Sequence, residues 1–309
     1  MLSIQGISKE YAGKPALENV SFNLAEGEIV ALLGANGSGK TTTVQSICGL
    51  VRFEQGNILF DRESISNNSH YLRHVGAVLD GSRNTNWRLT ASQNAEYFAR
   101  LRGVKPAQAR PIIKVLEAKL GLDKYHAQEV MKLSTGNKQK ASLLSALAYA
   151  PKLMLLDEPT LGLDLKTVSE LQNIILEQAR DVKQGFLITS HDLTFIDRIC
   201  DRVVVLEQGR VIFNGTVSEL KSHMFHFELR VNSDNAHLVE MKNAMASICK
   251  GKLDVQCHAP ELRVQYDNVG QVLPLLTWLD QQSWTPASIQ IEELNVEKAY
   301  RTLIDHEVA

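Results

Sequence analysis

The fold of this chain of 309 residues can be argued from the segment Gly34-Ala-Asn-Gly-Ser-Gly-Lys40-Thr41. It fits the pattern G-x-x-x-x-G-K-[ST], in which the glycines let backbone N–H groups close around phosphate oxygens. A continuous apolar run, Ile29–Leu33, precedes the segment, as expected for a strand that is buried on both faces of a sheet. A helical pattern through Val44 and Ile47 follows, so the positive end of a helix would face the bound anion. Strand, loop and helix in this order predict a phosphate-binding loop.

A second apolar run, Leu153–Leu156, ends at two carboxylates, Asp157 and Glu158. Strands of parallel sheets present ligands at their carboxyl ends, where the phosphate loop also lies. Lys40 is expected to reach the β- and γ-phosphates of a nucleotide, and Thr41 and Asp157 to hold Mg²⁺. Glu158 is then free to orient or deprotonate the attacking water. Together the two motifs predict nucleotide hydrolysis, although an apolar strand followed by two acids would predict little by itself.

Short apolar runs alternate with longer helical patterns from residue 1 to about 215, which indicates an α/β fold with a largely parallel sheet. The first two runs, Leu2–Ile7 and Val20–Leu24, flank a turn and are expected to pair antiparallel. Between about residues 88 and 150 the strands stop, and Thr90 with Gln93 forms a capping box at the start of a helix. This stretch is therefore expected to be a helical insert. Further strands are predicted at Val75–Leu79, Phe186–Ile188, Val203–Leu206 and Val211–Phe213.

The pattern changes again at about residue 220. Phe227, Leu229 and Val231 alternate as in a strand, and two similar triplets begin at Leu253 and Leu262. One helical stripe lies between the first two triplets, and a second stripe and a short apolar run follow the third. The order β-α-β-β-α-β is that of a ferredoxin-like module. We therefore expect a small C-terminal α+β accessory domain at residues 221–309, separate from residues 1–220.

Composition and charge argue against several classes of protein. Hydrophobic residues make up 44% of the chain and charged residues 22%, as in ordinary globular proteins. The formal net charge of −2 provides no overall basic field, so no nucleic-acid partner is expected. The N-terminus lacks the pattern of a signal peptide, and no stretch approaches the ~18 apolar residues of a membrane span. At a membrane, another chain would have to supply the spanning helices.

A segment between the phosphate loop and the strand carboxylates carries a more specific signal. Leu133-Ser-Thr-Gly-Asn-Lys-Gln139 opens an apolar helix and resembles the LSGGQ signature of ABC ATPases, at intervals similar to those of the family. Tyr11 lies where the family places an aromatic residue against adenine. Pro159–Asp164 resembles the segment that crosses the dimer interface, and Thr189–Asp192 resembles the segment with the switch histidine. The resemblance covers roughly residues 1–220 with six ordered motifs.

The resemblance implies a site for ATP with Mg²⁺ as its metal. Glu158 would act as the base for the attacking water, and His191 would contact the γ-phosphate. Thr41, Asp80 and Asp157 would hold Mg²⁺. The residues implied to contact ATP are Tyr11, Gly34, Ala35, Asn36, Gly37, Ser38, Gly39, Lys40, Thr41, Thr42, Ser134, Gly136 and Asp164.

Two positions depart from the family pattern. Thr135 replaces the first glycine of the signature, a change that is tolerable if Ser134 and Gly136 still donate to the γ-phosphate. Asp80 stands near the position of the family's Q-loop glutamine, where it keeps oxygens for Mg²⁺ but adds charge and shortens the reach. This loop touches the membrane partner in the family, so Trp87 is a candidate anchor in that contact. A core tryptophan of the helical insert is the equal alternative.

The resemblance further implies a P-loop NTPase core of the ABC type, with an antiparallel subdomain. The family works as a head-to-tail dimer, here of two copies or with a paralogous ATPase subunit, in which two subunits sandwich each ATP. The run from Glu158 to Gly162, the helical insert and the C-terminal module resemble ATPases of two-component exporters of drugs, antibiotics, lipids or polysaccharides. The chain is then expected to be cytoplasmic, on the inner face of the membrane through a separate transmembrane permease.

Two other interpretations remain open on the sequence. A soluble ABC switch that acts on ribosomes or chromosomes would share the nucleotide motifs, but such proteins usually carry two cassettes or long coiled coils, and this chain shows neither. RNA-recognition domains share the β-α-β-β-α-β order, but Glu261–Asp267 lacks their aromatic pattern. The C-terminal module is therefore expected to be regulatory or to stabilise the dimer.

Overall fold

The computed structural model describes residues 1–66, 68–79, 84–222, 227–248, 253–266, 269–282, 284–293, 296–297, 300 and 303. The chain forms two compact units, Met1–Thr216 and Val217–Ala309. Within the described part of the chain, no helix combines the length and the apolar character that crossing a bilayer requires.

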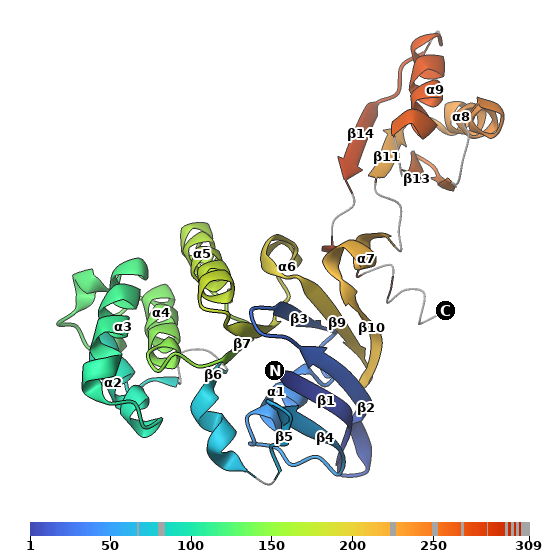
Figure 1. Ribbon diagram of the computed structural model, residues 1–309. Coiled ribbons are helices and arrows are strands. Elements are labelled where there is room, and N and C mark those ends of the chain that lie inside the picture. The colour runs from blue at the N-terminus through green and yellow to red at the C-terminus, as the bar shows by residue number, and fades with distance from the viewer. Residues whose placement is uncertain are drawn as a thin grey trace. The chain divides into compact units, whose positions relative to one another are not determined.

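The first unit is built on a six-stranded sheet with the strand order β10-β9-β3-β8-β7-β6 (Figure 1). All of these strands run parallel except β10, which pairs antiparallel with β9. Every residue of β3 is buried, as its uninterrupted apolar sequence requires. The predicted α/β fold with a largely parallel sheet is therefore confirmed. The strands are β3 (Ile29–Leu33), β6 (Val75–Val78), β7 (Leu153–Asp157), β8 (Gly185–Thr189), β9 (Arg202–Glu207) and β10 (Arg210–Thr216).

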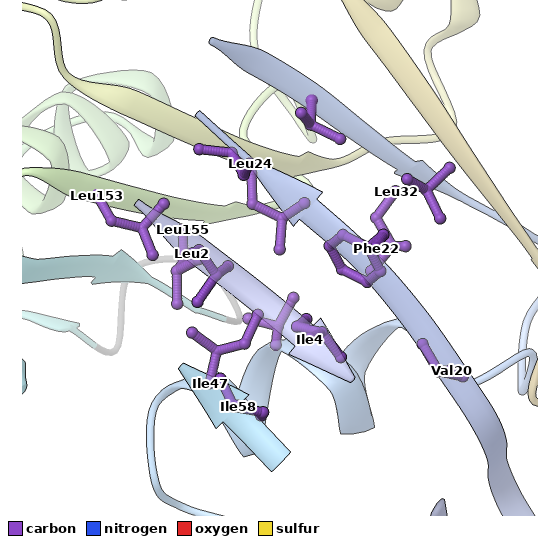
Figure 2. Packing of buried hydrophobic residues seen from close by; sticks show 14 of the residues in the cluster. Leu2, Ile4, Val20, Phe22, Leu24, Leu32, Ile47, Ile58, Leu153 and Leu155 are labelled. Carbon is purple, nitrogen blue, oxygen red and sulfur yellow. The ribbon is translucent and has the colours of Figure 1, made fainter. Parts of the chain in front are cut away.

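A second, antiparallel sheet with the order β2-β1-β4-β5 forms the predicted antiparallel subdomain. Side chains of both sheets and of helix α1 (Lys40–Ile47) share one hydrophobic cluster. Among its members in Figure 2 are Leu2 of β1, Leu155 of β7 and Ile47 of α1. Because α1 begins at the lysine of the phosphate loop, this packing fixes the loop to both sheets. The strands are β1 (Leu2–Tyr11), β2 (Lys14–Leu24), β4 (Gln55–Phe60) and β5 (Glu63–Ser64).

The predicted helical insert is present, and its helix α2 packs against both α3 and α4. The capping box at its start is confirmed, since the Thr90 hydroxyl accepts from the Gln93 N–H and the Gln93 side chain accepts from the Thr90 N–H. Short 3-10 helices lie at Ser69–His74, Asp123–Tyr125 and Val130–Lys132. The α-helices of this unit after α1 are α2 (Ala91–Leu101), α3 (Pro106–Lys119), α4 (Thr135–Leu147), α5 (Leu165–Asp181) and α6 (Leu193–Ile199).

The second unit begins with helix α7 (Val217–Ser222) and continues with elements in the order β-α-β-β-α-β. Its antiparallel sheet has the strand order β12-β13-β11-β14. The sheet's apolar residues form a separate core with both helices; Leu229 and Val264 of the sheet pack there with Met241 and Leu275 of the helices. The elements are β11 (Phe227–Asn232), α8 (Asn235–Ile248), β12 (Asp254–His258), β13 (Glu261–Tyr266), α9 (Val269–Asp280) and β14 (Ser288–Glu293).

Candidate active site

The phosphate loop joins β3 to α1 and depends on glycine for its shape. Gly34 has φ 154° and Gly39 has φ 107°, both in the region that disfavours side chains. A Cβ on Gly34 would lie 2.3 Å from the Leu206 carbonyl oxygen, and one on Gly39 would lie 2.7 Å from the Ala16 carbonyl oxygen. The loop therefore folds close to the backbone of β2 and β9. Gly39 caps α1 without a side chain, which leaves the first-turn N–H groups available to an anionic ligand.

Lys40 extends back across this loop. Its Nζ donates to the carbonyl oxygens of Gly34 at 2.7 Å and Ala35 at 3.1 Å. Burial lowers the pKa of Lys40, while the charges of Glu158 and Asp157 act in the opposite direction. The ammonium thus lies in a partly desolvated place opposite two carboxylates, where an anionic ligand would be a stronger partner than two neutral carbonyls.

The two carboxylate residues, Asp157 and Glu158, lie where β7 ends. Glu158 has φ 49°, an unfavourable conformation for a residue with a Cβ. Its N–H is held by Thr189, through the carbonyl oxygen at 3.0 Å and Oγ1 at 3.1 Å. Glu158 Oε2 accepts from the His191 N–H at 3.1 Å, and the buried Oε1 lies 3.3 Å from His191 Nε2 without a hydrogen bond. The Thr189 hydroxyl also donates to Asp157 Oδ1.

A cavity of about 250 Å³ brings these groups together. Thr41 and Asp157 both line it and offer hydroxyl and carboxylate oxygens, the ligand type that Mg²⁺ prefers. In the described residues, no group of three or more His, Cys, Asp or Glu side chains could hold a metal. Mg²⁺ suits such a site because it usually binds through few protein ligands, water and substrate phosphates. The lining residues are Ala16, Asn36, Gly37, Gly39, Lys40, Thr41, Thr42, Asp157, Glu158 and His191.

Some residues predicted to contact ATP lie outside this cavity. Gly34 and Ala35 instead supply the carbonyls that hold Lys40, and Ser38 is buried in the loop. Tyr11 ends β1 and is 47% exposed, with Lys9 Nζ 5.2 Å from its ring centroid. The predicted metal ligand Asp80 lies outside the residues that the structure describes.

The signature segment also lies outside the cavity, next to the segment that precedes α5. The Ser134 hydroxyl caps α4 by accepting from the Asn137 N–H, and Asp164 caps α5 by accepting from the Thr167 N–H. A Cβ on Gly136 would lie 3.6 Å from Leu163 Cδ2, so the two helix starts are in contact range. Ser134, Gly136 and Asp164 thus share one surface of the chain, separate from the phosphate loop.

Comparisons with known proteins agree with this geometry. A family model described as "ABC transporter" matches residues 17–161. The ABC transporter ATP-binding protein NatA of Bacillus subtilis is 30% identical over 225 residues, which cover 71% of this chain and 91% of NatA. The chain belongs to the family of ABC transporter ATP-binding proteins. ATP binding and hydrolysis are general to the ATP-binding domains of this family.

Two further ABC proteins extend the comparison. The linearmycin resistance ATP-binding protein LnrL of Bacillus subtilis is 26% identical over 309 residues, 98% of each chain, so this likeness includes the C-terminal unit. Among solved structures, the dimeric bacterial ABC transporter cassette MJ0796 aligns with a TM-score of 0.64 and 25% identity. That alignment covers 70% of this chain and 98% of the cassette, and it supports the P-loop core of the ABC type.

A second cavity of the ABC core, of about 720 Å³, lies between the sheet and the helical insert. It is lined by Val75 and Ala77 of β6, by 84–86 after the predicted Q-loop position, and by residues of α2 and α4. Its wall is mixed, with apolar side chains beside Arg102. Trp87 is the next residue in the chain after Asn86 of this wall. It is 47% exposed, and Lys138 Nζ lies 5.3 Å from its ring centroid. Of the two alternatives for Trp87, the core position is therefore wrong, because the ring lies on the surface beside Lys138 of α4.

Two residues that line or support the site, Ala16 and Thr189, were not predicted from the sequence. Ala16 reaches the cavity because β2 passes the phosphate loop, and an alanine in a strand gives no signal of this. Thr189 lies inside the segment Thr189–Asp192, in which the family resemblance assigns a role to the histidine alone. Its hydroxyl contacts become visible only when β7 and β8 are known to be neighbours.

Proposed function

We propose that this chain is the ATP-hydrolysing subunit that drives a separate membrane permease, and that the permease exports a drug, antibiotic, lipid or polysaccharide. The single observation that carries the ATPase assignment is the cavity that unites Lys40, Thr41, Asp157, Glu158 and His191. Export is supported by the likeness to LnrL, named for linearmycin resistance, because it extends over 98% of this chain. No observation favours the soluble-switch alternative.

Different residues of the chain would carry out different parts of ATP hydrolysis. Lys40 would exchange its two loop carbonyls for oxygens of the β- and γ-phosphates, beside the first-turn N–H groups of α1. Glu158 would take a proton from the attacking water, with its side chain held by the His191 backbone N–H. Thr41 and Asp157 would hold Mg²⁺, which neutralises phosphate charge when bound. Catalysis is then mainly positioning and electrostatic stabilisation.

The second half of each ATP site would come from a second subunit. Ser134, Gly136 and Asp164 lie outside the cavity formed by their own chain, so a head-to-tail partner is needed to bring such residues to the nucleotide. Leu161 and Leu165 flank Asp164 and are 77% and 90% exposed, as expected of a segment that a partner covers. The likeness to a dimeric cassette supports this arrangement. A second copy is the economical partner, and a paralogous subunit would serve equally.

The permease would dock at the 720 Å³ cavity and at Trp87 beside it. This surface combines half-exposed aromatic rings, Trp87 and Tyr97, with the cation of Arg102, a combination that is enriched at binding hot spots. The chain would then lie on the cytoplasmic face of the membrane through its permease. No nucleic acid is needed for this function.

The test combines enzymology with co-purification. The tagged chain is co-expressed with the membrane protein encoded by an adjacent gene, and its Mg²⁺-dependent phosphate release is measured with and without that partner. Hydrolysis together with recovery of the partner in detergent supports the proposal. Recovery with ribosomes or DNA, and never with membranes, would overturn it in favour of the soluble switch.

A further inference from the structure

The residue at the end of β8, Thr189, contacts both carboxylate residues of the site. In the sheet it lies beside Asp157, as the last pair in the parallel register of β7 and β8. Its side chain is completely buried. Oγ1 donates to Asp157 Oδ1 and accepts from the Glu158 N–H at 3.1 Å, and the Thr189 carbonyl oxygen accepts from the same N–H at 3.0 Å.

A single hydroxyl group can make both of the side-chain contacts of Thr189. A threonine hydroxyl has one hydrogen and two acceptor lone pairs, so it can donate to Asp157 and accept from Glu158 at once. The donated bond occupies Oδ1 of Asp157 and thereby fixes the carboxylate's rotation, with Oδ2 left for another ligand. The bond that the hydroxyl accepts from the Glu158 N–H helps to hold the backbone of Glu158 in its left-handed conformation. That conformation is unfavourable for a residue with a Cβ.

We propose that Thr189 is a positioning residue for ATP hydrolysis, whose hydroxyl orients Asp157 toward Mg²⁺ and Glu158 toward the attacking water. This inference rests on the proposed ATPase function, because it assigns a role within the same site. The phosphate loop has its own contacts to Lys40 and α1, so Thr189 acts on the metal and on the rate and leaves the binding of metal-free ATP unchanged.

The experiment compares T189V, which keeps the branched shape and loses the hydroxyl, with T189S, which keeps the hydroxyl. T277V is the matched control, because it makes the same Thr→Val change at a hydroxyl that donates to the Leu273 carbonyl oxygen in α9, and neither residue lines the cavity. Mn²⁺ binding in the presence of ATP is measured by electron paramagnetic resonance. The kcat and KM for ATP, and ATP affinity in EDTA, are measured alongside.

A hydrogen bond to a charged group is strong enough that T189V should weaken Mn²⁺ binding about tenfold and lower kcat by at least as much. ATP affinity in EDTA should equal that of wild type, and T189S and T277V should behave as wild type in every assay. Wild-type Mn²⁺ affinity in T189V, or a T189S protein as impaired as T189V, would overturn the inference. If T189V melts below the assay temperature, T189A makes the same comparison. An inactive wild-type chain would instead refute the proposed ATPase.

Discussion

Replacing Glu158 by glutamine is the sharpest perturbation that the site offers, because the structure predicts almost no effect on stability and a large effect on rate. Glu158 Oε2 accepts from the His191 N–H, a bond that an amide oxygen can also accept. The amide NH₂ would then take the place of Oε1, 3.3 Å from His191 Nε2, and could donate to a neutral imidazole. No hydrogen bond is lost and the backbone conformation is the same, so the free energy of unfolding should change by less than about 1 kcal/mol.

The rate of ATP hydrolysis, in contrast, should fall strongly. An amide can hold the attacking water but cannot take its proton, and a positioned general base contributes roughly 10²- to 10⁴-fold. We therefore expect E158Q to hydrolyse ATP at least about 100-fold more slowly than wild type. Its affinity for ATP should be equal or higher, because one negative charge beside the triphosphate is removed.

The assay is single-turnover phosphate release at saturating Mg²⁺ and ATP, with thermal melting of the nucleotide-free protein and size exclusion with ATP. The stalled protein should collect as an ATP-dependent dimer. E177Q is the matched control, since it makes the same Glu→Gln change in an exposed ion pair. Glu177 pairs there with Lys119, and neither residue lines the cavity. A folded E158Q protein that binds ATP and hydrolyses it at the wild-type rate would refute the assignment of Glu158 as the base.

Three other predictions follow from the same geometry. K40A should lower ATP affinity about 100-fold or more, because charge-assisted phosphate contacts are lost, yet still melt as a folded protein; near-normal affinity in calorimetry would remove the phosphate loop from the mechanism. W87A should keep the basal ATPase rate and melting temperature but lose co-purification with the permease, whereas L101A, which removes an exposed leucine of α2 that does not line the 720 Å³ cavity, should keep co-purification. A chain that ends after Ser222 should still bind ATP, since every cavity residue precedes that point; failure to bind would contradict the independence of the first unit.

The parts of the site that the sequence predicted are those that depend on local spacing. The loop's glycines, Lys40 and Thr41 follow one strand directly, and Asp157 and Glu158 lie at the end of another, so each motif can be recognised in a short stretch of sequence. That β3 is a buried strand was also predictable, because a short run that is apolar throughout suits a strand covered on both faces.

The parts that the sequence did not predict depend on which elements become neighbours. Thr189 and Asp157 are 32 positions apart and meet only because β8 pairs with β7. Ala16 meets the phosphate loop because β2 passes it, and no periodicity in the chain reports that crossing. The surface position of Trp87 was undecidable for a similar reason, because a large aromatic residue before a helix suits a core and an interface equally.

The division of the predicted ATP contacts between two surfaces of one chain bears on assembly. Asp157, Glu158 and His191 line the cavity, while Ser134 and Asp164 cap two helices that start side by side elsewhere. In a two-fold symmetric dimer, a contact between one surface of the first subunit and another surface of the second is made twice. The proposed head-to-tail pairing would therefore complete two ATP sites at once and cover the exposed leucines beside Asp164. Each chain then needs only one copy of each motif, which is what this sequence carries.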